Sequence, residues 1–107
     1  MKYRKLCEDI KKALLAGIEA ENAMKNDGGC CNFDSAAIHL PRWVGKKVEE
    51  AAENAGTHAF KWHGLNGYYV FWPKTHGHGN KRSANAEAMT KALRDMGYEA
   101  MMYCQMD

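Results

Sequence analysis

A short Asn66-Gly67 step between two aromatic-rich runs is the feature that most restricts how this chain can fold. The run before the step reads THAFKWHG, and the run from the glycine onward reads GYYVFWP. Asn and Gly both accept the left-handed backbone of a tight hairpin turn, and aromatic residues favour strands. We therefore predict two antiparallel strands, at residues 59–63 and 68–72, joined by this turn.

Three other segments carry apolar residues at the three-and-four spacing that is typical of a helix with one buried side. The first covers residues 3–24. The second has Pro41 in its first turn and stops at Gly56, and the third stops at Gly97. The chain is thus predicted to contain three helices.

Two further strands are predicted from residues 30–40, which are apolar on both faces, and from the alternating C-terminal run YEAMMYCQM. The order of elements is then a helix followed by β-α-β-β-α-β. This order predicts an α+β fold, a ferredoxin-like βαββαβ sandwich with an additional N-terminal α-helix, whose first and third strands are central. We predict a single domain over residues 1–107, with the N-terminal helix at 1–26 and the βαββαβ core at 30–107.

The predicted N-terminal helix has an apolar stripe that includes Leu6, Ile10 and Leu14. In a ferredoxin-like sandwich two helices cover one face of the sheet and leave the other face open. We predict that the stripe packs on this open face. The alternative is a homodimer formed through the N-terminal helix.

Composition limits the kinds of partner this chain is expected to bind. The 107 residues are 46% hydrophobic and carry a net charge of +2, without the basic excess of dedicated DNA-binding domains. No apolar run approaches the roughly 20 residues needed to span a bilayer, so we expect a cytoplasmic protein with no membrane partner. The four cysteines show no C-x-x-C spacing, and we expect reduced thiols.

The segment KTHGHGNKRS, residues 74–83, follows a predicted strand and precedes a predicted helix. Free backbone N–H groups and the helix dipole favour anions at such a place, although neither the dinucleotide fingerprint nor the phosphate-loop pattern is complete. One interpretation is an anion or phosphate-backbone contact. The other is that Ser83 or Asn85 caps the helix and the remaining side chains are solvated. The candidate binding residues are Lys74, His76, His78, Asn80, Lys81 and Arg82.

Metal binding has less support than anion binding. His76 and His78 could ligate one ion, but the candidate ligands lack the paired spacing of a structural zinc site. The further candidates are His58, His63, Cys30 and Cys31. We therefore predict no metal and no cofactor.

Catalysis has little support in the sequence as well. Asp34, Ser35 and His39 are polar groups on a predicted central strand. A buried Asp34 needs a partner, which Asn32, Lys61 or a backbone N–H could supply. We interpret Asp34 as a structural group. Because no nucleophile motif or meaningful carboxylate pair is present, we predict that the protein is not an enzyme.

Nucleic acid binding has two conceivable geometries. The Gly67-Tyr68 step resembles the Gly-aromatic signature of RNA-recognition domains, but Asn66 replaces the leading basic residue and Tyr69 stands where a small residue is expected. A helix on the open sheet face would also block an aromatic platform. The other geometry holds nucleic acid with basic side chains alone. Those side chains are Lys46, Lys47, Lys74, Lys81 and Arg82.

Three sequence patterns carry a resemblance to a known group of proteins. They are C-N-F-D-S at 31–35, G-x-G-x-x-R at 77–82 and A-E-A-x-x-x-A-L-R-x-x-G-Y at 86–98. With these patterns the chain, from about Gly29 to its end, resembles short uncharacterised proteins of phages and integrated elements in gut bacteria. The resemblance implies small cytosolic accessory proteins, many of which bind and block a host defence nuclease, as anti-CRISPR proteins do.

The leading functional expectation is a non-enzymatic binding protein whose target is a host protein or a protein–nucleic-acid complex. The first alternative is a nucleic-acid or nucleotide-phosphate binding protein that uses the segment from Lys74 to Arg82. The second is a small metal-dependent enzyme. A salt titration separates the first two, because phosphate contacts give a steep dependence of affinity on salt and a mostly apolar interface does not.

Overall fold

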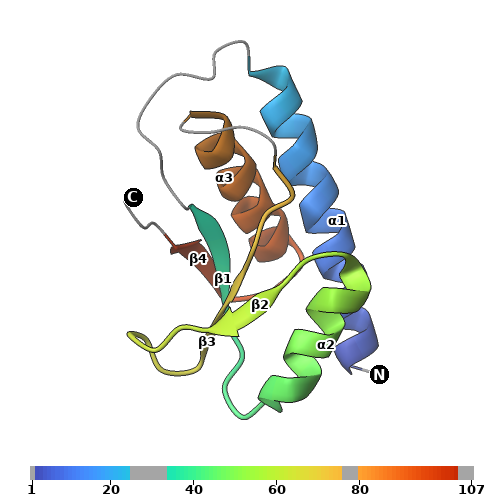
Figure 1. Ribbon diagram of the computed structural model, residues 1–107, viewed down its shortest axis with the longest axis vertical. Helices are drawn as coiled ribbons and strands as arrows, with labels where there is room; N and C mark the ends of the chain where they lie inside the picture. Colours follow the sequence, from blue (N-terminus) through green and yellow to red (C-terminus); the bar gives the residue numbers. More distant parts are fainter. Residues whose placement is uncertain (1, 25–33, 76–79, 104–107) are drawn as a thin grey trace.

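The chain folds into a four-stranded sheet with three helices on one side (Figure 1). The computed structural model describes residues 2–24, 34–75 and 80–103. The order of elements along the chain is the predicted helix followed by β-α-β-β-α-β. These elements are α1 (Lys2–Ala23), β1 (Ser35–His39), α2 (Gly45–Ala55), β2 (Ala59–Lys61), β3 (Tyr68–Phe71), α3 (Asn80–Asp95) and β4 (Ala100–Tyr103).

The sheet has the order β2-β3-β1-β4, and every neighbouring pair is antiparallel. The prediction that the first and third strands are central is therefore confirmed. Ala37 of β1 lies opposite Val70 of β3 and Met101 of β4. Because side chains alternate along a strand, Ala36 and Ile38 point to the helices, whereas Ala37 points to the opposite face. Residues 30–33 of the predicted first strand lie outside the described residues.

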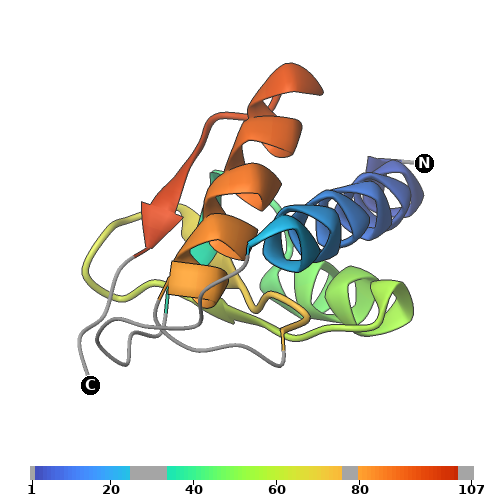
Figure 2. The same cartoon turned by 90° about the horizontal axis from the view of Figure 1, so that it is seen from above.

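Helix α1 does not cover the open sheet face, and that prediction is wrong. Leu6, Ile10 and Leu14 are buried as expected, but α1 packs against α2 and α3 on the side of the sheet where those helices lie (Figure 2). The reason lies in α2, whose buried side is mostly alanine. These small side chains leave a wide groove between α2 and α3, and the larger side chains of α1 fill it.

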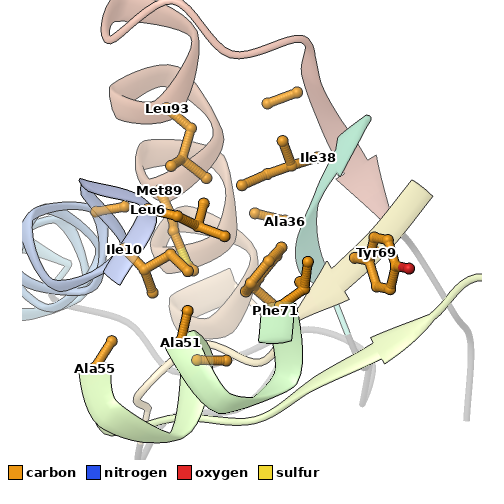
Figure 3. Close-up of a cluster of buried hydrophobic side chains, with 14 of the residues drawn as sticks. Leu6, Ile10, Ala36, Ile38, Ala51, Ala55, Tyr69, Phe71, Met89 and Leu93 are labelled. Atoms are coloured by element: carbon orange, nitrogen blue, oxygen red, sulfur yellow. The ribbon is translucent and has the colours of Figure 1, made fainter. Parts of the chain in front are cut away.

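Figure 3 shows this junction of the three helices and the sheet. Leu6 and Ile10 of α1 approach Met89 of α3, and Ala51 of α2 closes the cluster beneath Phe71 of β3. The apolar stripe of α1 is thus buried within the chain, so its burial does not require a second copy. The homodimer formed through α1 stays a prediction. No helix in the described part of the chain is long and apolar enough to cross a membrane.

Two predicted helix starts differ from the structure. Helix α2 begins at Gly45, and Pro41 lies in a separate turn in which Arg42 has a φ of 67°. Helix α3 begins at Asn80, so Ser83 and Asn85 lie inside the helix and do not cap it. Short polar residues favour caps and turns, but packing against α1 recruits Asn85 into the helix interior instead.

The predicted hairpin is present with a longer connection than the two-residue turn. Strand β2 ends at Lys61 and β3 begins at Tyr68, and the Trp62 N–H still donates to the Tyr68 carbonyl at 2.9 Å. Gly67 has a φ of 81°, which is the left-handed conformation that was expected there. The antiparallel pairing of the two aromatic-rich runs is confirmed.

Candidate functional site

The sheet face away from the helices is covered by aromatic side chains. Phe60 of β2, Tyr68 of β3 and Tyr103 of β4 project to this face because of strand alternation, and Trp62 and Trp72 flank them at the strand ends. We call these five residues the aromatic face. It draws on both edge strands and on a central strand.

Rings from opposite edges of the sheet meet across its middle. The Tyr103 ring centroid lies 6.1 Å from that of Phe60 and 4.8 Å from that of Trp62, both edge to face. This approach is sterically allowed because the central positions between them are small, namely Ala37 and Val70, which the rings bury completely. Edge-to-face pairs of this kind contribute about 0.5–1.5 kcal/mol each beyond their buried area.

The aromatic face still exposes apolar surface. Phe60 retains 39% of its accessible surface and is one of three large hydrophobic residues that the described chain leaves exposed. Trp62, Tyr68 and Tyr103 are half-buried. The rings therefore protect the centre of the sheet without a helix and leave their outer edges available for contact.

Charged groups lie at the two ends of this face, Glu99 at one end and the Arg82 guanidinium beside Trp72 at the other. Within the described strands no lysine or arginine points to this side. At the end where β1 finishes, Nδ1 of His39 lies 2.5 Å from the Glu99 carboxylate, and the imidazole stacks on the Tyr68 ring with centroids 4.7 Å apart. Burial raises the pKa of the Tyr68 hydroxyl, and the charge of Glu99 and the hydrogen bond donated to it add to that shift. The middle of the face is uncharged.

Arg82, one of the predicted contact residues, is inside the protein. Only 8% of it is exposed. Its Nε donates to the Asp34 carbonyl at 3.0 Å, its Nη2 lies 3.5 Å from the Ser35 hydroxyl, and its guanidinium lies 4.7 Å from the Trp72 ring centroid. Burial lowers the pKa of Arg82, and the charges of Asp34 and Glu21 oppose that shift. Arg82 thus packs against one ring of the aromatic face at the end of the sheet where β1 starts. It also brings a positive charge close to the buried Asp34, for which Asn32, Lys61 or a backbone N–H was the expected partner.

The other predicted site residues are placed in different surroundings. Lys74 is exposed and Lys81 is half-exposed near the start of α3. His76 and His78 lie outside the described residues, and Asn80 is the first residue of α3. The binding segment as a whole stays a prediction.

A buried polar network holds the first two residues of the predicted binding segment, Lys74 and Thr75. The Asn85 side-chain amide donates to the Lys74 carbonyl at 2.7 Å and to the Glu21 carboxylate at 2.9 Å. The Thr75 hydroxyl donates to the same carboxylate. Residues 74 and 75 are therefore tied to both α1 and α3. Across residues 2–24, 34–75 and 80–103, no three His, Cys, Asp or Glu side chains gather in a way that would hold a metal ion.

Sequence reasoning missed the aromatic face as a free surface because it placed α1 over it. The signal that could have corrected this is the alanine-rich buried side of α2, formed by Ala51, Ala52 and Ala55, which predicts a groove beside α2 that needs filling. Comparison with known proteins found no significant match to a family model, a curated protein or a solved structure.

Proposed function

We propose that this protein is a non-enzymatic binding protein that docks a protein partner on its aromatic face. The observation that carries the proposal is a helix-free sheet face with five aromatic side chains and no lysine or arginine pointing from its strands. The centres of protein interfaces are enriched in aromatic residues and methionine and depleted in charged residues. Met101, which projects to the same face, fits this composition.

A protein partner has more support on this face than nucleic acid. Phosphate groups are bound chiefly by lysine and arginine, which the strands do not direct to this side. Base stacking also needs rings that lie open, whereas Trp62 and Tyr103 pack edge to face at 89°. The alternative of a phosphate contact at residues 74–82 has lost support, because Arg82 is already engaged with Asp34 and Trp72.

We also propose a fold family for the βαββαβ part and a class of target. The strand order and the position of α2 and α3 over one face support placing the βαββαβ part among ferredoxin-like sandwiches. The resemblance to phage and mobile-element proteins suggests the class of target, a host nuclease effector that is a protein or a protein–nucleic-acid complex. In this proposal the protein acts in the cytoplasm by occupying a surface of that effector.

The test compares a variant of the aromatic face with a matched surface variant in partner capture from a host lysate. Phe60→Ser removes the most exposed ring of the face, and Leu15→Ser removes a similarly apolar side chain, 61% exposed, from α1. We expect the wild type and Leu15→Ser to retain a nuclease effector and Phe60→Ser to lose it by about tenfold or more, as is typical of a central apolar contact.

Two controls complete this experiment. Thermal denaturation of each variant shows whether Phe60→Ser is still folded, and nuclease treatment of the captured material shows whether nucleic acid tethers the partner. Unchanged capture by a folded Phe60→Ser variant would contradict the proposal, and loss of wild-type capture after nuclease treatment would exclude a target made of protein alone. A steep dependence of affinity on salt would favour nucleic acid instead.

A further inference from the structure

A second site lies at the end of the sheet where β1 finishes, away from Arg82. A cavity of about 430 Å³ opens there between the turn that follows β1 and the loop that joins β2 to β3. Its lining includes His39, Arg42, Trp43, Lys61 and Tyr69. A volume of this size is in the range of small-molecule sites. We call it the Arg42 pocket.

The Arg42 pocket carries two positive charges that pair with none of the described residues. Arg42 and Lys61 are both exposed, and neither side chain has a hydrogen bond, ion pair or ring contact with any residue in the described part of the chain. No aspartate or glutamate lines the cavity. His39 at the rim is already paired with Glu99, so the net charge of the lining comes from Arg42 and Lys61.

The backbone at Arg42 is held in an uncommon conformation. Its φ of 67° makes it the one non-glycine residue with a positive φ among the described residues. Left-handed backbone costs an L-residue other than glycine, asparagine or aspartate about 1–2 kcal/mol. Such conformations gather at functional sites, where they aim a side chain. Here the side chain in question is one of the two cations of the pocket.

Tyr69 supplies an unused hydrogen-bonding group inside the pocket. Only 6% of the residue is exposed, yet its hydroxyl bonds to none of the described residues. Figure 3 shows the hydroxyl pointing away from the hydrophobic cluster that holds its ring. The hydroxyl oxygen is not a fully buried atom, so it opens into the cavity and is available to donate a hydrogen bond to a ligand.

The start of α2 reaches the same hydroxyl. A methyl group added to Gly45 would lie 3.1 Å from the Tyr69 hydroxyl oxygen. The residue before the helix, Val44, offers no side-chain cap, and in the described chain the N–H groups of Gly45 and Lys46 have no backbone acceptor. The positive end of the helix dipole therefore adds to the two cations and the hydroxyl.

We propose that the Arg42 pocket binds the phosphate group of a small phosphate monoester. A guanidinium, an ammonium and a phenol, close to the positive end of a helix dipole, suit a tetrahedral dianion with many acceptor sites better than a planar carboxylate. The apolar lining around Trp43 and Pro41 suits the organic part of the ligand. This site is separate from the aromatic face and does not rest on the proposed function.

The test is a calorimetric titration of the full chain at low salt, once with adenosine 5′-monophosphate and once with inorganic phosphate. The Arg42→Gln, Lys61→Gln double variant should weaken adenosine 5′-monophosphate binding by at least about tenfold, because two charge-assisted hydrogen bonds are lost. Tyr69→Phe should weaken it by about threefold to tenfold while the melting temperature stays unchanged or rises.

The matched control is the Lys11→Gln, Lys91→Gln double variant, which removes the same charge from exposed positions on α1 and α3. It should leave the affinity within about twofold, since charges beyond about 10 Å are screened. An equal loss in this control would overturn the proposal, and so would acetate binding as tight as phosphate binding or the absence of saturable binding. A single-stranded oligonucleotide that binds more tightly than the monoester would overturn it in favour of a phosphodiester chain.

Failure here is distinguishable from failure of the proposed function. If the double variant is unfolded, Tyr69→Phe alone decides, because it removes one oxygen and keeps the packing of the ring. Partner capture is measured with Phe60→Ser, and the pocket variants should leave it unchanged.

Discussion

Arg82 and Arg42 lie near opposite ends of β1 and have opposite surroundings. Arg82 is buried and bonded to the backbone of Asp34, and its guanidinium stacks on Trp72. Arg42 is exposed, strained in its backbone and without a partner among the described residues. The sequence pointed to Arg82 as a contact residue and passed over Arg42. A cation therefore acquires its role from what the fold places around it, and the local motif does not decide it.

The different surroundings of Arg82 and Arg42 follow from the elements in which they lie. Arg82 lies in the first turn of α3, on the side that faces the start of β1, so the helix directs it inward. Arg42 lies in a turn just after Pro41, where its side chain bonds to none of the described residues. The first arginine stabilises the fold, and the second is available to a ligand.

The largest expected effect comes from Arg82→Ala. We expect the free energy of unfolding to fall by about 2–4 kcal/mol, because the Asp34 carbonyl and the buried carboxylates lose a charged partner. Urea denaturation followed by circular dichroism measures it, with Arg42→Ala as the matched control, which should change stability by less than about 0.5 kcal/mol. Equal effects of the two substitutions would remove the distinction between the two arginines.

The next effect tests how tightly the buried polar network near Arg82 is packed. A methyl group on Gly17 of α1 would lie 2.0 Å from the Oδ1 atom of Asn85 on α3. Gly17→Ala should therefore destabilise the protein by about 1–3 kcal/mol, although alanine favours the helix by about 1 kcal/mol. A denaturation midpoint at or above the wild-type value would show that α1 and α3 can separate at this point without cost.

Arg42→Gly is expected to stabilise the protein by about 0.5–1 kcal/mol, since glycine adopts the positive φ without the steric cost that arginine bears. The same variant should bind adenosine 5′-monophosphate more weakly. Thermal denaturation and calorimetry on one preparation measure both quantities. Lower stability combined with unchanged binding would mean that Arg42 belongs with Arg82 as a structural residue.

The smallest effect concerns a charge pair of intermediate burial. Asp9 accepts hydrogen bonds from Lys5 at 2.7 Å and from the Tyr98 hydroxyl at 2.6 Å. Burial alone would raise the pKa of Asp9, but the hydrogen bonds from Lys5 and Tyr98 and the nearby lysine charges lower it below 3.8. A lowered folded-state pKa means that ionised Asp9 stabilises the fold above its unfolded-state pKa, and that this stability is lost as the pH falls through the folded-state pKa.

Asp9→Asn should therefore cost about 0.5 kcal/mol at neutral pH, a small value because Lys5 is largely exposed. The difference from the wild type should shrink below about pH 4. Denaturation at a series of pH values measures it, and a difference that is the same at pH 3 and pH 7 would contradict the ionic origin.

Much of the secondary structure followed from local patterns. The stripes of α1 and α2, the glycines at 56 and 97 and the aromatic runs around Gly67 all predicted elements that are present. The start of α3 was misplaced because Ser83 and Asn85 have the side chains of a helix cap. In the fold Asn85 bonds to Glu21 of α1, and that partner is 64 residues away along the chain.

The sequence by itself determined the order of elements and the antiparallel sheet, because residue periodicity, turn residues and strand polarity are local and each agreed with the same arrangement. Only the tertiary structure decided where α1 packs, since an apolar stripe does not specify its partner and the groove between α2 and α3 exists only once both helices lie on the sheet. It also decided which cations remain free. Arg82 is bonded to a segment that is distant along the chain, whereas Arg42, Lys61 and Tyr69 line one cavity beside the turn that follows β1.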